Sequence, residues 1–150
     1  MSVTSTESTE KLRLTPQESV EVVSVDAERL VVEATYAPGG ERPPAHQHPK
    51  QDEHFEVLAG SLRVEAGGEV RTYSEGEKFD IPRGTPHRMA NEGTVPARVI
   101  WTTSPAGRTL EWFRALEGTQ RRVEGRKLAR VVAFIPLLIR FRDTFRLARG

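Results

Sequence analysis

The sequence predicts an all-β barrel followed by a C-terminal helical extension, in a chain of 150 residues. Eight short runs rich in Val, Ile, Tyr and Phe lie between residues 20 and 103, and clusters of Gly, Pro and Asp separate them. Short strands at even spacing are typical of barrels and sandwiches rather than of folds that alternate strands with helices. After Gly107 the apolar residues recur every three or four positions, which is the spacing of a helix.

The strands are expected, in chain order, at residues 20–25, 30–36, 54–58, 62–66, 70–73, 78–81, 88–90 and 98–103. Gly60 and Gly76 are expected at turns with a positive φ, which glycine adopts without steric cost. Pro82 and Gly84 would fix a bend between two of the strands, and Asn91 would tie down a loop through side-chain to backbone hydrogen bonds.

The extension is expected to hold two helical stretches. Thr109 can cap a short helix that runs to about Leu116 and ends at residues 117–119. A second stretch is expected over residues 122–148, with either a kink or two abutting helices at Pro136, because proline lacks a backbone N–H. The chain is therefore divided into a tail with a lead-in strand (1–19), a barrel (20–104) and a helical extension (105–150).

Composition excludes several classes of site and of protein. The chain has no cysteine, so it forms no disulfide, thiolate zinc site or cysteine nucleophile. The N-terminal residues are rich in Ser, Thr and Glu where a secretory signal needs a basic patch and an apolar run. The longest apolar stretch, residues 128–139, is too short to span a bilayer. We expect a cytoplasmic protein without a membrane span.

Charge is distributed unevenly along the chain. Residues 1–107 hold 11 Lys and Arg against 17 Asp and Glu, for a net charge of −6, whereas residues 108–150 hold 11 against 4, for +7. A basic tail can meet nucleic acid, an acidic membrane surface or the acidic body of its own chain. We favour docking on the body, expect no nucleic-acid partner, and interpret the Leu/Phe stripe of the tail as a packing element.

Two spaced motifs carry the chemistry of the chain. The first is Gly40-x5-His46-x-His48-x4-Glu53-x6-Gly60, and the second is Gly76-x5-Pro82-x-Gly84-x2-His87-x3-Asn91. Histidines two apart on an extended chain point to the same side, and Glu53 opens the next strand. His46, His48, Glu53 and His87 would form a mixed nitrogen/oxygen site for one divalent ion, either Fe, Mn, Ni, Cu or Zn. Four protein ligands on an octahedral ion leave two positions open for water or substrate.

Together these two motifs resemble those of the cupin superfamily, with every fixed position filled between residues 40 and 91. The resemblance implies a small single-domain cupin of the jelly-roll barrel type, with Glu53, Phe55 and Val57 pointing inward. It also implies pairing of barrels, so we predict a homodimer. The tail after residue 107 lies outside the resemblance.

Some residues keep two interpretations. His54 is most simply a surface or interface residue, and the alternative is that it replaces Glu53 as a ligand. Aromatic and apolar side chains could line a ligand pocket but are equally explained as barrel core; they are Tyr36, Phe55, Phe79, Met89 and Trp101.

Function is open between three classes. The first is a mononuclear metal-dependent oxygenase, quercetinase-like, acting on a small organic substrate that chelates through oxygen, with Glu53 as ligand and base. The second is a non-catalytic module that binds or senses a small ligand, and the third is a metal-dependent isomerase or lyase. The candidate bases are Glu53, Tyr36 and Tyr73, and because spacing forces no second carboxylate into the pocket, the isomerase is less favoured.

Overall fold

The structure is a computed structural model that describes residues 10–40 and 42–148. In chain order its elements are β1 (Lys11–Arg13), β2 (Glu18–Val25), β3 (Leu30–Tyr36), β4 (His46–Gln47), β5 (Asp52–Ala59), β6 (Ser61–Ala66), β7 (Glu69–Ser74), β8 (Lys78–Ile81), β9 (His87–Ala90), β10 (Ala97–Ser104), α1 (Thr109–Arg122), α2 (Lys127–Arg140) and β11 (Arg146–Leu147).

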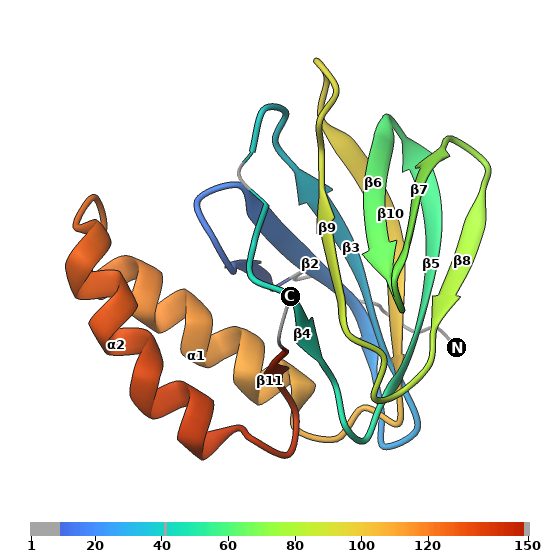
Figure 1. The fold of residues 1–150 in the computed structure, drawn as a ribbon. Coiled ribbons are helices and arrows are strands. Elements are labelled where there is room, and N and C mark those ends of the chain that lie inside the picture. Colours follow the sequence, from blue (N-terminus) through green and yellow to red (C-terminus); the bar gives the residue numbers. More distant parts are fainter. Residues whose placement is uncertain (1–9, 41, 149–150) are drawn as a thin grey trace, which may run out of the picture.

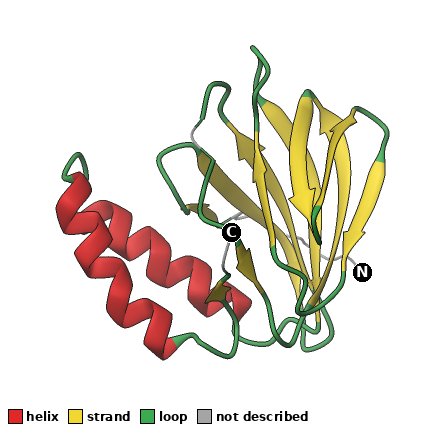
Figure 2. Ribbon diagram, in the orientation of Figure 1, coloured by secondary structure: helices red, strands yellow, loops and turns green. Residues whose placement is uncertain are grey.

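The strands form two antiparallel sheets that enclose one core. The six-stranded sheet has the order β1-β2-β3-β10-β5-β8, and the five-stranded sheet has the order β11-β4-β9-β6-β7. In Figure 1 the two helices lie to one side of these sheets, and Figure 2 shows that helix is confined to that part of the chain. The predicted fold class, an all-β jelly-roll barrel with a helical extension, is confirmed.

Alternation along β5 follows the predicted pattern. Glu53, Phe55 and Val57 are buried, whereas His54 is exposed. The Phe55 ring stacks on Phe79 of β8 at 4.7 Å and on Trp101 of β10 at 5.5 Å, so three neighbouring strands contribute to one aromatic layer. The inward orientation of the first motif's strand therefore follows from its period of two.

Two backbone expectations are also confirmed. Gly60 has a φ of +74°, and a Cβ there would lie 2.6 Å from the Pro96 carbonyl oxygen, so no other residue fits this turn. The Asn91 side chain donates to the carbonyl oxygens of Tyr36 and Val95 at 2.9 and 2.8 Å and accepts from the Gly93 N–H at 2.9 Å. Asn91 thus ties the loop before β10 to the end of β3.

The expected ends of the first helix are wrong. Arg108 is the N-cap residue and Thr109 makes no capping bond, and α1 continues through Gly118 to Arg122. Glu117 accepts a hydrogen bond from the backbone N–H of Arg13, at 2.9 Å. Contacts with β1 therefore extend α1 past residues 117–119, where the low helix propensity of Gly118 and Thr119 suggested that it would end.

The second helical stretch is shorter than expected. α2 runs through Pro136 as one helix but ends at Arg140, and residues 146–147 form β11, which pairs with β4. Strand pairing over a hundred residues of sequence leaves no local signal, so periodicity alone could not reveal it. β1 lies within residues 1–19, where a lead-in strand was expected, whereas the two-residue strand β4 was not predicted.

The extension is held to the barrel by aromatic packing more than by charge. Trp112 and Phe113 of α1 are buried in the common core, and Phe113 lies 5.2 Å from the Trp101 ring. Within residues 10–40 and 42–148, Arg114 with Glu10 is the one ion pair between a cation of the tail and a carboxylate of the acidic body. Helix α1 and strand β11 dock on the body, although not through the expected electrostatic attraction. The apolar stripe of α2, which was expected to pack, is exposed.

Candidate metal centre

Three histidines from two separate stretches meet inside the barrel. His46 on β4 and His87 on β9 are register partners, and His48 follows β4 directly. One ring nitrogen of each lies within 4.8 Å of those of the other two. His48 and His87 are buried and His46 is half-buried. The first motif and the second motif thus converge on one point, as their spacing predicted.

Glu53 approaches two of these rings. Its Oε2 lies 3.3 Å from His48 Nε2, and its Oε1 lies 3.2 Å from His87 Nε2. His48 Nε2, His87 Nε2 and Glu53 Oε1 are buried, and none of these three atoms has a hydrogen-bond partner. The contacts between them are therefore not hydrogen bonds. Buried polar atoms are rarely left unpaired, since each costs about 1–3 kcal/mol. Three such atoms facing one another indicate a site suited to a cation.

Backbone carbonyls fix the orientation of each ring. The Nδ1 atoms of His46, His48 and His87 lie 3.3, 2.8 and 2.8 Å from carbonyl oxygens of Pro44, Thr144 and Thr85, respectively. A carbonyl only accepts hydrogen bonds, so Nδ1 carries the proton and Nε2 presents its lone pair. Metal-binding histidines are oriented in this way by their surroundings.

The protonation states of His46 and Glu53 also suit metal binding. Burial, followed by the neighbouring rings of His87 and His48, lowers the pKa of His46 to about 3, so this ring is neutral at pH 7. Burial raises the pKa of Glu53, but the surrounding histidines outweigh it and the net pKa lies below the usual value. Glu53 is therefore a carboxylate, and a metal ligand must be deprotonated in this manner.

Trp101 positions the carboxylate. Its indole N–H donates to Glu53 Oε2 at 2.9 Å, which leaves Oε1 directed at His87 without a hydrogen-bond partner. The sequence indicated Trp101 only as core or pocket lining, although a buried indole needs a hydrogen-bond acceptor. Because Phe113 packs against Trp101, helix α1 supports the candidate ligand Glu53 from outside the barrel.

The C-terminal segment covers the same site. The Phe145 ring stacks on His46 at 4.6 Å and also on Trp112 of α1 at 4.6 Å. Thr144, the residue before it, supplies the carbonyl that holds His48. No feature of the sequence pointed to this role, because Thr144 and Phe145 are 96 and 97 positions from His48 and belong to no motif.

The remaining sequence candidates lie elsewhere. His54 is exposed on the outer face of β5, where its Nδ1 is 2.7 Å from Asp80, so it is a surface residue. Tyr73 stacks on Phe79 at 4.2 Å on the other side of the aromatic layer. Tyr36 is buried in the barrel core, as are Phe55, Phe79, Met89 and Trp101.

Glu18 is a second acidic group that the sequence did not single out. It lies on the same face of β2 as the buried Val20 and pairs in register with Tyr36. Burial raises the pKa of Glu18 to about 7; the Tyr36 hydroxyl lowers it in part, and the charge of Glu53 raises it further. The only signal was its inward position in a strand whose other inward residues are apolar.

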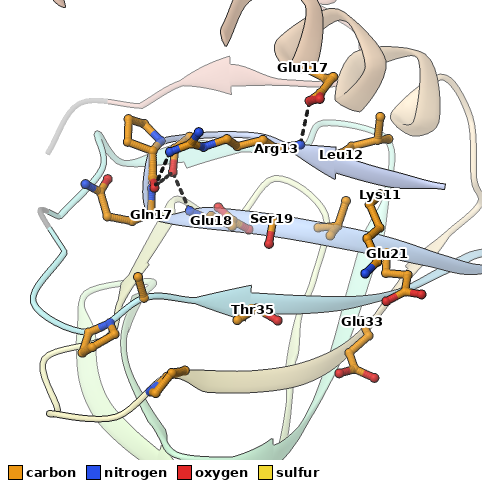
Figure 3. Close-up of a pocket in the computed structure, with 16 residues that line it drawn as sticks. Lys11, Leu12, Arg13, Gln17, Glu18, Ser19, Glu21, Glu33, Thr35 and Glu117 are labelled. Atoms are coloured by element: carbon orange, nitrogen blue, oxygen red, sulfur yellow. Dashed lines mark hydrogen bonds between the residues drawn. The ribbon is translucent and has the colours of Figure 1, made fainter. Parts of the chain in front are cut away.

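A surface pocket lies apart from the histidines, on the outside of β1, β2 and β3. Figure 3 shows its lining, in which the labelled side chains include Lys11, Ser19, Glu21, Glu33 and Thr35. Both charge signs occur, and none of the four candidate ligands lines it. The candidate metal ligands are therefore inside the barrel, apart from this pocket.

Comparison with known proteins agrees with this geometry. The family profile described as Cupin domain matches residues 32–103, the segment that holds both motifs. Residues 32–103 form a cupin domain. This cupin is 39% identical over 66 residues to the tetracenomycin polyketide synthase protein TcmJ of Streptomyces glaucescens. The aligned segment covers 44% of each chain. It is 43% identical over 70 residues to Germin-like protein 1-1 of Oryza sativa. That aligned segment covers 43% of this chain and 32% of the germin-like protein.

Solved structures show the same fold. KdgF from Halomonas sp. superposes with a TM-score of 0.61 at 25% identity, over 67% of this cupin and 92% of that chain. An oxalate oxidase in complex with glycolate gives a TM-score of 0.52 at 28% identity, over 61% of this cupin and 53% of that chain. This cupin spans less than half the length of the curated relatives named above.

Among residues 10–40 and 42–148, no helix is both long and apolar enough to cross a membrane.

Proposed function

We propose that His46, His48, Glu53 and His87 hold one divalent transition metal ion. The observation that carries the proposal is the set of three buried, unpartnered polar atoms on His48, His87 and Glu53. All three histidines present Nε2, and the carboxylate is charged, so the donor set is complete without rearrangement. Nitrogen and oxygen donors of this kind suit Fe, Mn, Ni, Cu or Zn.

The reaction we propose is that of a mononuclear metal-dependent oxygenase, quercetinase-like, whose small organic substrate chelates through oxygen. When bound, the metal supplies a Lewis-acidic centre for the oxygen atoms of the substrate. Glu53 Oε1 accepts the acidic proton of the substrate, while the Trp101 indole N–H keeps Oε2 in place. The stack of Phe145 on His46 excludes water from this side of the centre. A structural relative is an oxalate oxidase that binds glycolate, which is itself a small oxygen chelator.

Elemental analysis of protein purified without added metal tests the metal site. We expect stoichiometric metal in the wild type and in His54→Ala, whose ring lies on the outer face of β5. His48→Ala should lose most of the metal. Equal metal in His48→Ala and the wild type would contradict the proposed ligand set.

The reaction is tested separately by oxygen dependence. With quercetin and with oxalate as probes, we expect substrate loss in air and none under nitrogen. Ligand recovered unchanged in air, with metal present, would instead favour the non-catalytic binding module. This outcome would leave the metal site itself intact.

A second candidate is a metal-dependent isomerase or lyase, which Glu18 favours. A carboxyl group with a pKa near 7 is suited to exchange protons with a substrate at neutral pH. Activity under nitrogen, with incorporation of solvent deuterium that Glu18→Gln abolishes, would support this candidate over the oxygenase.

We also retain the predictions of a homodimer and of a cytoplasmic protein. Sedimentation equilibrium at micromolar concentration tests the first, and a monomer under these conditions would contradict it.

A further inference from the structure

Helix α2 exposes an apolar stripe along its outer face. Its members recur every three or four residues, so they align along one side of the helix. Each is between 54% and 77% exposed; they are Leu128, Val131, Val132, Ile135 and Ile139. The opposite side of α2 is the packed one, with Leu137 and the following Phe141 buried. Both faces of this helix are therefore apolar, but only one is covered by the chain itself.

Positively charged side chains lie at both ends of this stripe. Arg126 and Lys127 lie at its N-terminal end, and Arg140 and Arg142 lie at its C-terminal end. Residues 125–142 include no Asp or Glu. In the described part of the chain, these four cations form no ion pair, so their charge is available to a partner.

Such charges disfavour a second copy of the chain as the occupant. Two copies of α2 that paired their stripes would place cation against cation in a parallel and in an antiparallel arrangement. The acidic barrel of another copy offers charge but little apolar surface. Its large exposed apolar side chains, in the part that the structure describes, are on separated elements; they are Val23 and Val25 on β2, Val70 on β7 and Val95 before β10.

We propose that α2 docks on an anionic lipid surface, with its apolar stripe inserted at the level of the headgroups. A helix with an apolar stripe and flanking Lys and Arg is the typical form of an interfacial helix. At 14 residues α2 is about 21 Å long, so it lies along the surface and does not cross it. The negative charge of residues 1–107 turns the barrel away from the lipid, so α2 is the side that approaches it.

Co-sedimentation with vesicles tests this proposal on the full chain. We expect wild-type protein to pellet with phosphatidylcholine vesicles that contain phosphatidylglycerol and to pellet far less with phosphatidylcholine alone. The double variant Val131→Glu/Ile135→Glu should lose at least about tenfold in partition coefficient. Arg126→Gln and Lys127→Gln should each weaken binding to the anionic vesicles roughly fivefold, since each cation contributes about 1 kcal/mol near such a surface.

The matched control is Val23→Glu/Val25→Glu, which adds the same two charges at exposed valines of β2. This variant should bind vesicles like the wild type, and circular dichroism should show all variants folded. Equal binding to neutral vesicles, or equal loss in both double variants, would overturn the proposal. So would a wild-type dimer in sedimentation that Val131→Glu/Ile135→Glu dissociates, because a second copy would then cover the stripe. Monomeric protein that binds neither vesicle would also overturn it, in favour of an acidic protein partner.

Discussion

The barrel and the C-terminal extension use their apolar residues in opposite ways. On β10, the inward residues Val99 and Trp101 are 0% and 7% exposed and face other strands of the same chain. On α2, the outer residues Leu128 and Ile135 are 77% and 54% exposed. In both regions the periodicity of the sequence identifies an apolar face, but periodicity does not identify what covers that face.

The candidate metal centre crosses the boundary between these regions. The barrel contributes the three histidines and Glu53, whereas the extension orients and covers them through Thr144, Phe145 and Phe113. The cupin profile ends at residue 103, before any of the three. The extension is therefore expected to influence metal binding although it supplies no ligand.

The largest expected effect contrasts one buried and one exposed side chain. Phe55→Ala should lower the free energy of unfolding by about 3–5 kcal/mol, because it empties the space between Phe79 and Trp101. Ile135→Ala, on the outer face of α2, should change it by less than about 0.5 kcal/mol. Urea titration followed by circular dichroism measures both. A loss of several kcal/mol in Ile135→Ala would show that the stripe is covered in solution.

The next prediction concerns the contribution of the extension to the metal centre. Phe145→Ala removes the ring stacked on His46, and we expect metal affinity to fall about tenfold, at the lower end of what residues behind a ligand contribute. Competition with a chelator measures this affinity. Leu147→Ala, two residues away and 48% exposed, is the control and should bind metal normally. Equal affinity in Phe145→Ala and the wild type would confine the centre to the barrel.

Most of the barrel could be predicted from the sequence because its signals are local. All eight expected strands are present, and Glu53, Phe55 and Val57 face inward as their alternation implies. The convergence of His46, His48 and His87 followed from two motifs of fixed spacing. Residues that act through short-range periodicity or turn chemistry are accessible to this kind of reasoning.

The rest depends on contacts between distant segments. α1 continues through Gly118 because β1 receives it, and β11 exists only because β4 offers an edge. The Thr144 carbonyl reaches His48 across 96 residues. The acidic character of Glu18 was visible, but its raised pKa depends on Tyr36 and Glu53, which only the folded barrel brings near it.

A smaller effect is expected from Glu18 itself. Its pKa in the folded state, about 7, exceeds its ordinary value of 4.5, so the stability that its protonated form provides is complete below pH 4.5 and is lost as the pH rises through 7. The side chain retains some contact with solvent, so the loss should be only about 1 kcal/mol. Urea titrations at pH 5 and pH 8 should show this difference in the wild type and not in Glu18→Gln. An unchanged difference in the variant would assign the pH dependence to another group.

The smallest effect is expected at the charged contact between the two regions. The hydrogen bond from Arg114 lowers the pKa of Glu10, partly opposed by burial, so the contribution of this pair is present above pH 4.5 and disappears as the pH falls. Both side chains are more than a third exposed, so Glu10→Gln should cost about 0.2–1 kcal/mol at low salt and less at high salt. Urea titration at the two salt concentrations measures it. Trp112 and Phe113 already bury α1 against the core. A larger loss in the free energy of unfolding that does not depend on salt would therefore mean that Glu10 acts through packing and not through its charge.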